Sequence, residues 1–129
     1  MSEVVEKQFK VAKAAREIAA EVRDGTFILN GTGLTFTSDG PCCVFGHVLA
    51  RAGFAPNDYI VENTEALARF LNVDYDHVAV HRVLDGQMDL IALSNDSADP
   101  HRGEEVAEHL EGFADEIEGI TIGGYRGES

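Results

Sequence analysis

The chain has 129 residues, which is enough for one domain with a single buried core. Its formal net charge of −13 argues against nucleic acid or an anionic bilayer as a partner and favours a basic one. The two cysteines, Cys42 and Cys43, are adjacent, so they cannot form the disulfide framework of a small secreted fold.

The first predicted element is a helix over residues 3 to 23. Val11, Ile18 and Val22 recur at helical spacing, and Asp24-Gly25 ends the pattern. Four basic residues recur every three positions, so they spiral around the exposed side: Lys7, Lys10, Lys13 and Arg16. We expect this solvated face to pair with glutamates of the same helix, namely Glu3, Glu6, Glu17 and Glu21.

Residues 26 to 37 predict a short β-hairpin. Two runs of apolar and β-branched residues flank the loop Asn30-Gly31-Thr32-Gly33. Two strands alone are marginal in water, so the hairpin must pack on the helices or gain a third strand. The loop lacks the lysine and the glycine spacing of a phosphate-binding loop.

A central helix is predicted from Cys42 to Ala52, after the break at Asp39-Gly40-Pro41. Apolar residues cover most of its circumference, which is typical of a buried helix. Gly53 is placed to adopt a left-handed conformation, and Phe54 to fold back on Leu49.

The next predicted helix begins at Asn63 or Thr64 as its cap and stops at Asn72. Residues 74 to 84 fit either a helix or one arm of a hairpin that turns at Asp85-Gly86. Residues 88 to 93 resemble a short buried strand.

The last helix is capped by Asp99 and has Pro100 at its first position. Its apolar stripe consists of Val106, Leu110, Phe113 and Ile117, and its opposite face carries the candidate binding residues Glu104, Glu108, Glu111 and Asp115. We expect one globular domain over residues 1 to 122, and a flexible tail over residues 123 to 129. The predicted class is α+β and mostly helical, with about four helices, the small hairpin at residues 26–37, and room for one or two further short strands.

The acidic charge is concentrated in the second part of the chain. Residues 1 to 54 carry six acidic and six basic residues, whereas residues 55 to 129 carry seventeen acidic and four basic ones. Such a field attracts a basic partner, although it can also serve only to keep the protein soluble. No apolar run approaches the ~20 residues of a membrane-spanning helix, so we expect a cytoplasmic protein without membrane contact.

One chemical candidate is a cysteine hydrolase centred on Cys43. A thiol at a helix N-terminus has its thiolate stabilised by the free backbone amides. A histidine such as His47, His77 or His81 would act as base, and Asn95 or Asp96 would orient it. A small cysteine packed under a turn explains the same residues without catalysis.

A structural metal site is the second chemical candidate. His77 and His81 are four residues apart, as are Cys43 and His47, so on helices each pair would face one way. Spacing of this kind also arises by chance, and the sequence has no Cys-x-x-Cys motif. We therefore assign no cofactor and no metal.

Three segments together resemble a small family of bacterial and bacteriophage proteins that has no assigned activity. The segments are Cys43-Val44-Phe45-Gly46, the apolar run Leu90 to Ser94 followed by Asn95-Asp96, and the helix from Val106 to Ile117. The resemblance covers roughly residues 5 to 118, and it implies a shared fold. Ser94 departs from the family pattern, which often has tryptophan before Asn-Asp.

The sequence therefore predicts a small acidic soluble protein that binds a basic host protein, is of phage or mobile-element type, and is not an enzyme. The cysteine hydrolase and the metal-binding domain are the alternatives. The oligomeric state does not follow from the sequence.

Overall fold

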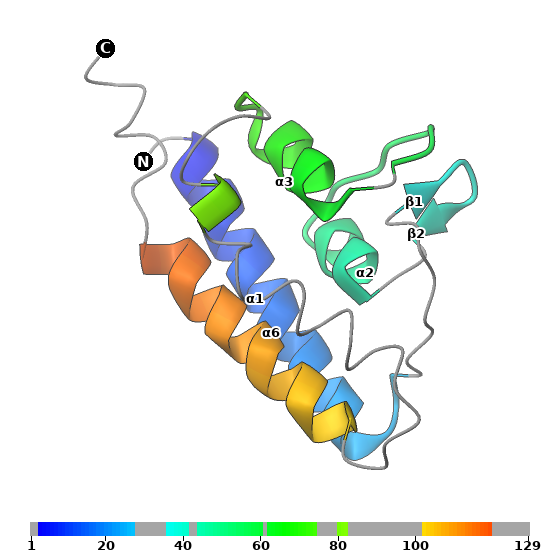
Figure 1. Ribbon diagram of the computed structural model, residues 1–129, viewed down its shortest axis with the longest axis vertical. Helices are drawn as coiled ribbons and strands as arrows, with labels where there is room; N and C mark the ends of the chain where they lie inside the picture. Colours follow the sequence, from blue (N-terminus) through cyan, green and yellow to red (C-terminus); the bar gives the residue numbers. More distant parts are fainter. Residues whose placement is uncertain are drawn as a thin grey trace.

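A computed structural model describes residues 3–27, 36–41, 44–60, 62–74, 80–82 and 102–119. Helix accounts for 73% of these residues, and a two-stranded antiparallel sheet accompanies it, which confirms the predicted α+β, mostly helical class. In chain order the elements are α1 (Glu3–Asp24), β1 (Phe36–Thr37), β2 (Gly40–Pro41), α2 (Val44–Arg51), α3 (Asn63–Leu71), a helical turn at residues 80–82, and α6 (Arg102–Gly119) (Figure 1).

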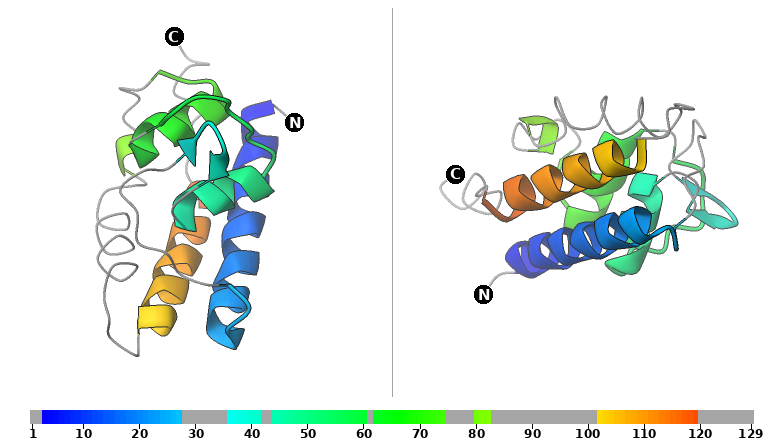
Figure 2. Two further views of the ribbon diagram at one scale, coloured as in Figure 1. Left: turned by 90° about the vertical axis from the view of Figure 1, so that its right-hand side faces the viewer. Right: turned by 90° about the horizontal axis from the view of Figure 1, so that it is seen from below.

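Helices α1 and α6 lie side by side and run in opposite directions, as Figure 1 and Figure 2 show. The predicted apolar stripes of both helices are buried between them and the rest of the core: Val11, Ile18 and Val22 of α1, and Val106, Leu110, Phe113 and Ile117 of α6. α1 ends as expected at Asp24, because Gly25 takes a φ of +85°. This antiparallel pair is the frame against which the other elements pack.

Helix α2 begins at Val44, and most of its residues are buried in the core. The Phe45 ring meets the Phe113 ring of α6 edge to face, with centroids 5.3 Å apart. At the other end Gly53 has a φ of +114°, and the Phe54 N–H donates to the Leu49 carbonyl at 2.9 Å. The glycine-terminated helix end predicted from the sequence is therefore confirmed.

The small sheet joins three stretches of chain. Phe36 pairs with Pro41 and Thr37 with Gly40, and Phe36 also exchanges two backbone hydrogen bonds with Ile60, at 3.0 and 3.1 Å. Of the hairpin predicted at residues 26–37, residues 28–35 lie outside the described residues. Its last residues do form a strand, but their described partners are Gly40–Pro41, because Ser38 and Asp39 form a tight turn.

Helix α3 ends as predicted at Asn72, which has a φ of +61° and donates its N–H to the Arg69 carbonyl at 3.2 Å. Its start differs from the prediction, because Glu62 occupies the capping position in an extended conformation, with no side-chain capping bond. The predicted strand at residues 88–93, the Asp99 cap and the tail at residues 123–129 lie outside the described residues. Residues 80–82, inside the ambiguous segment 74–84, are helical.

Candidate functional site

The four predicted binding residues, Glu104, Glu108, Glu111 and Asp115, share one side of α6, and we call them the α6 acidic stripe. Their spacing of three and four residues places them on neighbouring turns of the same helix face. Glu111 is half-buried and the other three are exposed, whereas the apolar stripe on the opposite side is fully buried. The structure thus brings all four carboxylates to one surface.

Arg23, in the last turn of α1, holds two members of the stripe. Its guanidinium donates to Glu104 Oε2 at 2.8 Å and to Glu111 Oε1 at 3.0 Å, both from Nη2. The hydrogen bonding from Arg23 lowers the pKa of Glu104. Glu104 and Glu111 are therefore bridged by one cation that comes from the neighbouring helix.

Arg16 of α1 contacts a second group of carboxylates further along the interface between α1 and α6, namely Asp115 and Glu118. Its two terminal nitrogens donate to the two oxygens of Glu118, at 2.8 and 2.9 Å, and Nη2 also donates to Asp115 at 2.8 Å. This forked contact lowers the pKa of Glu118. The expected pairing of Arg16 with glutamates of its own helix is wrong, because its side chain reaches across to α6.

The stripe remains negative after these contacts are counted. Its four carboxylates and Glu118 share two arginines, so among the side chains that the structure describes this group keeps a net charge of about −3. Glu108 is exposed and forms no ion pair with any residue that the structure describes. The surface along the α1–α6 seam is thus both acidic and held in place by arginines.

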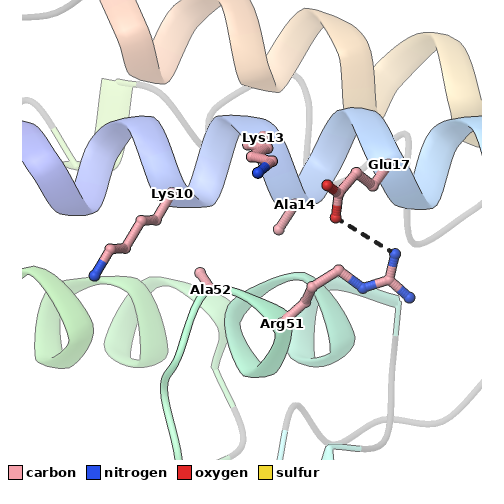
Figure 3. Close-up of a pocket in the computed structure, with 6 residues that line it drawn as sticks. All are labelled: Lys10, Lys13, Ala14, Glu17, Arg51 and Ala52. Carbon is pink, nitrogen blue, oxygen red and sulfur yellow. Dashed lines mark ion pairs between the residues drawn. The ribbon is translucent and has the colours of Figure 1, made fainter.

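A second site, which sequence reasoning did not identify, lies between α1 and α2, and we call it the α1–α2 pocket. It has a volume of about 270 Å³ and is lined by Lys10, Lys13, Ala14, Glu17, Arg51 and Ala52. Figure 3 shows Ala14 and Ala52 between the two helices, with Lys10 extending to one side and Arg51 extending to the other, toward Glu17. The small alanine side chains leave the space that the charged residues surround.

The three cationic side chains that line this pocket differ in the ion pairs that they form. Arg51 donates to Glu21 at 2.9 Å and lies 3.8 Å from Glu17, and the contact with Arg51 lowers the pKa of Glu21. Lys10 and Lys13 form no ion pair with the residues described here. The sequence signal for this site was Arg51, the one charged residue of a mostly apolar helix that also contains His47.

Of the predicted catalytic set, the structure describes only the histidines His47 and His81. Cys43, Asn95 and Asp96 lie outside the described residues, so their distances from His47 are not part of the structure. The His47 ring meets the Phe27 ring edge to face at 5.2 Å. Burial, and then the charge of Arg51, lower the pKa of His47, so its imidazole is neutral near pH 7.

Of the metal candidates, His77 lies outside the described residues, and His81 is half-buried in the turn at residues 80–82. Among the residues that the structure describes, no group of three or more His, Cys, Asp or Glu side chains could hold a metal ion. The described helices also include none with the length and apolar character needed to cross a bilayer.

Comparison with known proteins adds no relative. The resemblance to a bacterial and bacteriophage family stays a prediction. No protein-family model matches the chain, and no curated protein or solved structure is significantly similar to it.

Proposed function

We propose that this protein is a non-enzymatic interaction protein whose α6 acidic stripe binds a basic surface of a partner protein. The observation that carries the proposal is the net negative charge of this surface, where the four carboxylates of the stripe and the neighbouring Glu118 share two arginines among the described side chains. Lysine or arginine side chains of a partner would complete these ion pairs and would be steered to them over a distance.

The arginine contacts support binding because they order the carboxylates without covering them. The Asp115 side chain is 77% exposed and that of Glu104 is 54% exposed, although both accept hydrogen bonds from arginine. A carboxylate that is already held in one rotamer loses less conformational entropy when a partner binds. The stripe is therefore a preorganised acceptor surface.

A protein is the favoured class of partner. Nucleic acid carries a dense array of phosphates, which the stripe and the net charge of −13 both repel. The resemblance to bacterial and bacteriophage proteins adds the expectation that the partner is a host protein of the bacterial cytoplasm. The protein would then be of phage or mobile-element type.

The test begins with capture of the partner from nuclease-treated bacterial lysate at low and high salt, and continues with affinity measurements on the purified pair. Glu108→Lys is the informative variant, because Glu108 has no ion pair among the described residues and its reversal leaves the arginine contacts intact. We expect about a tenfold loss of affinity, and binding that weakens as salt rises.

Asp39→Lys is the matched control, since it makes the same charge change at an exposed residue of the β1–β2 turn, away from the stripe. Equal losses for Glu108→Lys and Asp39→Lys would show that net charge, and not the stripe, governs binding. Cys43→Ala should leave affinity unchanged. A loss of function from Cys43→Ala in a well-folded variant would instead favour the hydrolase alternative.

A further inference from the structure

The α1–α2 pocket gathers positive charge in a chain whose net charge is −13. All three lysines of the chain are on α1, and two of them, Lys10 and Lys13, line this pocket together with Arg51. The pocket is on the flank of α1 that faces α2, whereas Arg16 and Arg23 reach from α1 to α6. It is therefore separate from the α6 acidic stripe.

Of the three cationic side chains of the pocket, one is ion-paired and two form no ion pair with the described residues. Arg51 is fixed by Glu21 and Glu17, so its charge is already compensated. Lys10 and Lys13 are three residues apart on one helix, are exposed, and have no ion pair within the described parts of the chain. Two like charges lining one pocket repel each other, and an anion between them would remove that repulsion.

The third lysine provides an internal comparison. Lys7 forms an ion pair with Glu3 at 3.6 Å, and its ammonium group lies 5.4 Å from the centroid of the Phe70 ring. Lys7 therefore has partners of its own and does not line the pocket.

We propose that the α1–α2 pocket binds a small phosphate monoester. Near neutral pH such a phosphate carries about −1.5 to −2 charges, which matches the two available ammonium groups. Lysine binds phosphate as a point charge and needs no fixed geometry, in contrast to the forked contacts of Arg16.

The pocket is small and open to solvent. Its volume of about 270 Å³ is slightly below the range of about 300–1,000 Å³ typical of pockets for drug-sized ligands, which favours a phosphate with a short carbon skeleton. The methyl groups of Ala14 and Ala52 provide the apolar wall for that skeleton, and Glu17 lies at the side of Arg51 (Figure 3).

The test is an amide-resolved NMR titration of the full chain at low ionic strength with inorganic phosphate, ethyl phosphate and succinate. We expect ethyl phosphate to shift the signals of α1 and α2 around the pocket and to bind most tightly of the three. Lys10→Gln and Lys13→Gln should each weaken this binding about tenfold. Glu17→Gln should strengthen it about threefold, because it removes a carboxylate from the pocket wall.

Lys7→Gln is the matched control, since it removes a lysine of the same helix that does not line the pocket, and it should leave the affinity unchanged. Equal weakening by Lys7→Gln, or no weakening by Lys10→Gln and Lys13→Gln, would overturn the pocket as the site. Succinate binding as tightly as ethyl phosphate would overturn phosphate as the recognised group. None of these outcomes depends on the α6 stripe, because α6 contributes no residue to the pocket.

Discussion

The side-chain amide of Gln8 donates a 2.6 Å hydrogen bond to the backbone carbonyl of Ile117. Gln8 is the buried polar side chain of the described core, with 3% of its surface exposed. Ile117 lies in the last turn of α6, where carbonyl groups have no partner within the helix. Gln8 of α1 thus gives one C-terminal carbonyl of α6 a hydrogen-bond partner across the antiparallel pair.

Replacing Gln8 by methionine tests this contact, because methionine keeps the length of the side chain and removes the donor. We expect a loss of about 1–3 kcal/mol in the free energy of unfolding, since the Ile117 carbonyl would lose a buried partner. Lys10→Met, an exposed change on the same helix, is the control and should stay within ~0.5 kcal/mol. Urea unfolding measures both, and equal losses would contradict the role of the hydrogen bond.

Arg16→Gln tests the seam between α1 and α6. Arg16 contacts Glu118 through both oxygens, so this pair is expected to contribute about 1 kcal/mol, near the upper end for partly exposed ion pairs. The double-mutant cycle with Glu118→Gln isolates the pairwise energy. A cycle energy of zero would show that the two side chains meet without stabilising the fold.

The same pair predicts a pH dependence. The pKa of Glu118 is lowered in the folded state by the hydrogen bond from Arg16, so the unfolded chain takes up this proton first as the pH falls. The stabilisation by the Arg16–Glu118 pair is fully present above the ordinary carboxyl pKa of about 4.3, and it is lost as the pH falls through the lowered pKa of the folded state. The acid limb of a stability curve should therefore be shallower for Arg16→Gln than for the unmodified chain.

Much of the fold could be predicted because its signals are local. The apolar stripe of α6, with Leu110 and Phe113, follows from helical spacing, and every member of it is buried. The stops at Gly53 and Asn72 follow from backbone conformations that few residue types adopt, and both residues have a positive φ. Such features depend only on residues that are close together in the sequence.

The two candidate surfaces depend on contacts between distant parts of the chain, which hydrophobic periodicity does not report. Arg16 pairs with a helix about 100 positions away, and Arg51 joins the α1–α2 pocket only because α2 packs against α1. The pairing of Phe36 with Ile60 is equally non-local. Spacing on one helix predicted the four carboxylates of the α6 stripe, but the arginines that contact three of them lie on another helix.

His47 predicts a second pH dependence, near neutral pH. Burial, followed by the charge of Arg51, lowers the pKa of its imidazole in the folded state, so the unfolded chain is protonated first as the pH falls through about 6.5. The free energy of unfolding is therefore highest above that pH, where the imidazole is neutral in both states. It decreases as the pH falls below about 6.5 toward the lowered folded pKa. In His47→Gln the decline should be smaller, as measured by urea unfolding at about pH 7.5 and about pH 5.5.

Phe27→Ala provides the second variant for this prediction. Removing the ring that covers His47 edge to face should expose the imidazole and return its pKa toward the ordinary value. NMR titration of the His47 ring signals measures that pKa directly. An unchanged pKa in Phe27→Ala would show that Phe27 does not cause the shift, which would then come from burial by other residues and from the charge of Arg51.

Two glycines should respond to alanine in opposite directions. At Gly53 the φ of +114° is one that side chains with a Cβ rarely adopt, so Gly53→Ala should lower the free energy of unfolding by ~1–2 kcal/mol. At Gly103, near the start of α6, an added Cβ would meet Val22 Cγ1 at 3.6 Å, an ordinary contact, so Gly103→Ala should raise it by up to ~1 kcal/mol. Thermal and urea unfolding of both variants check the signs. A loss in Gly103→Ala would mean that α6 needs to approach the end of α1 more closely than this contact implies.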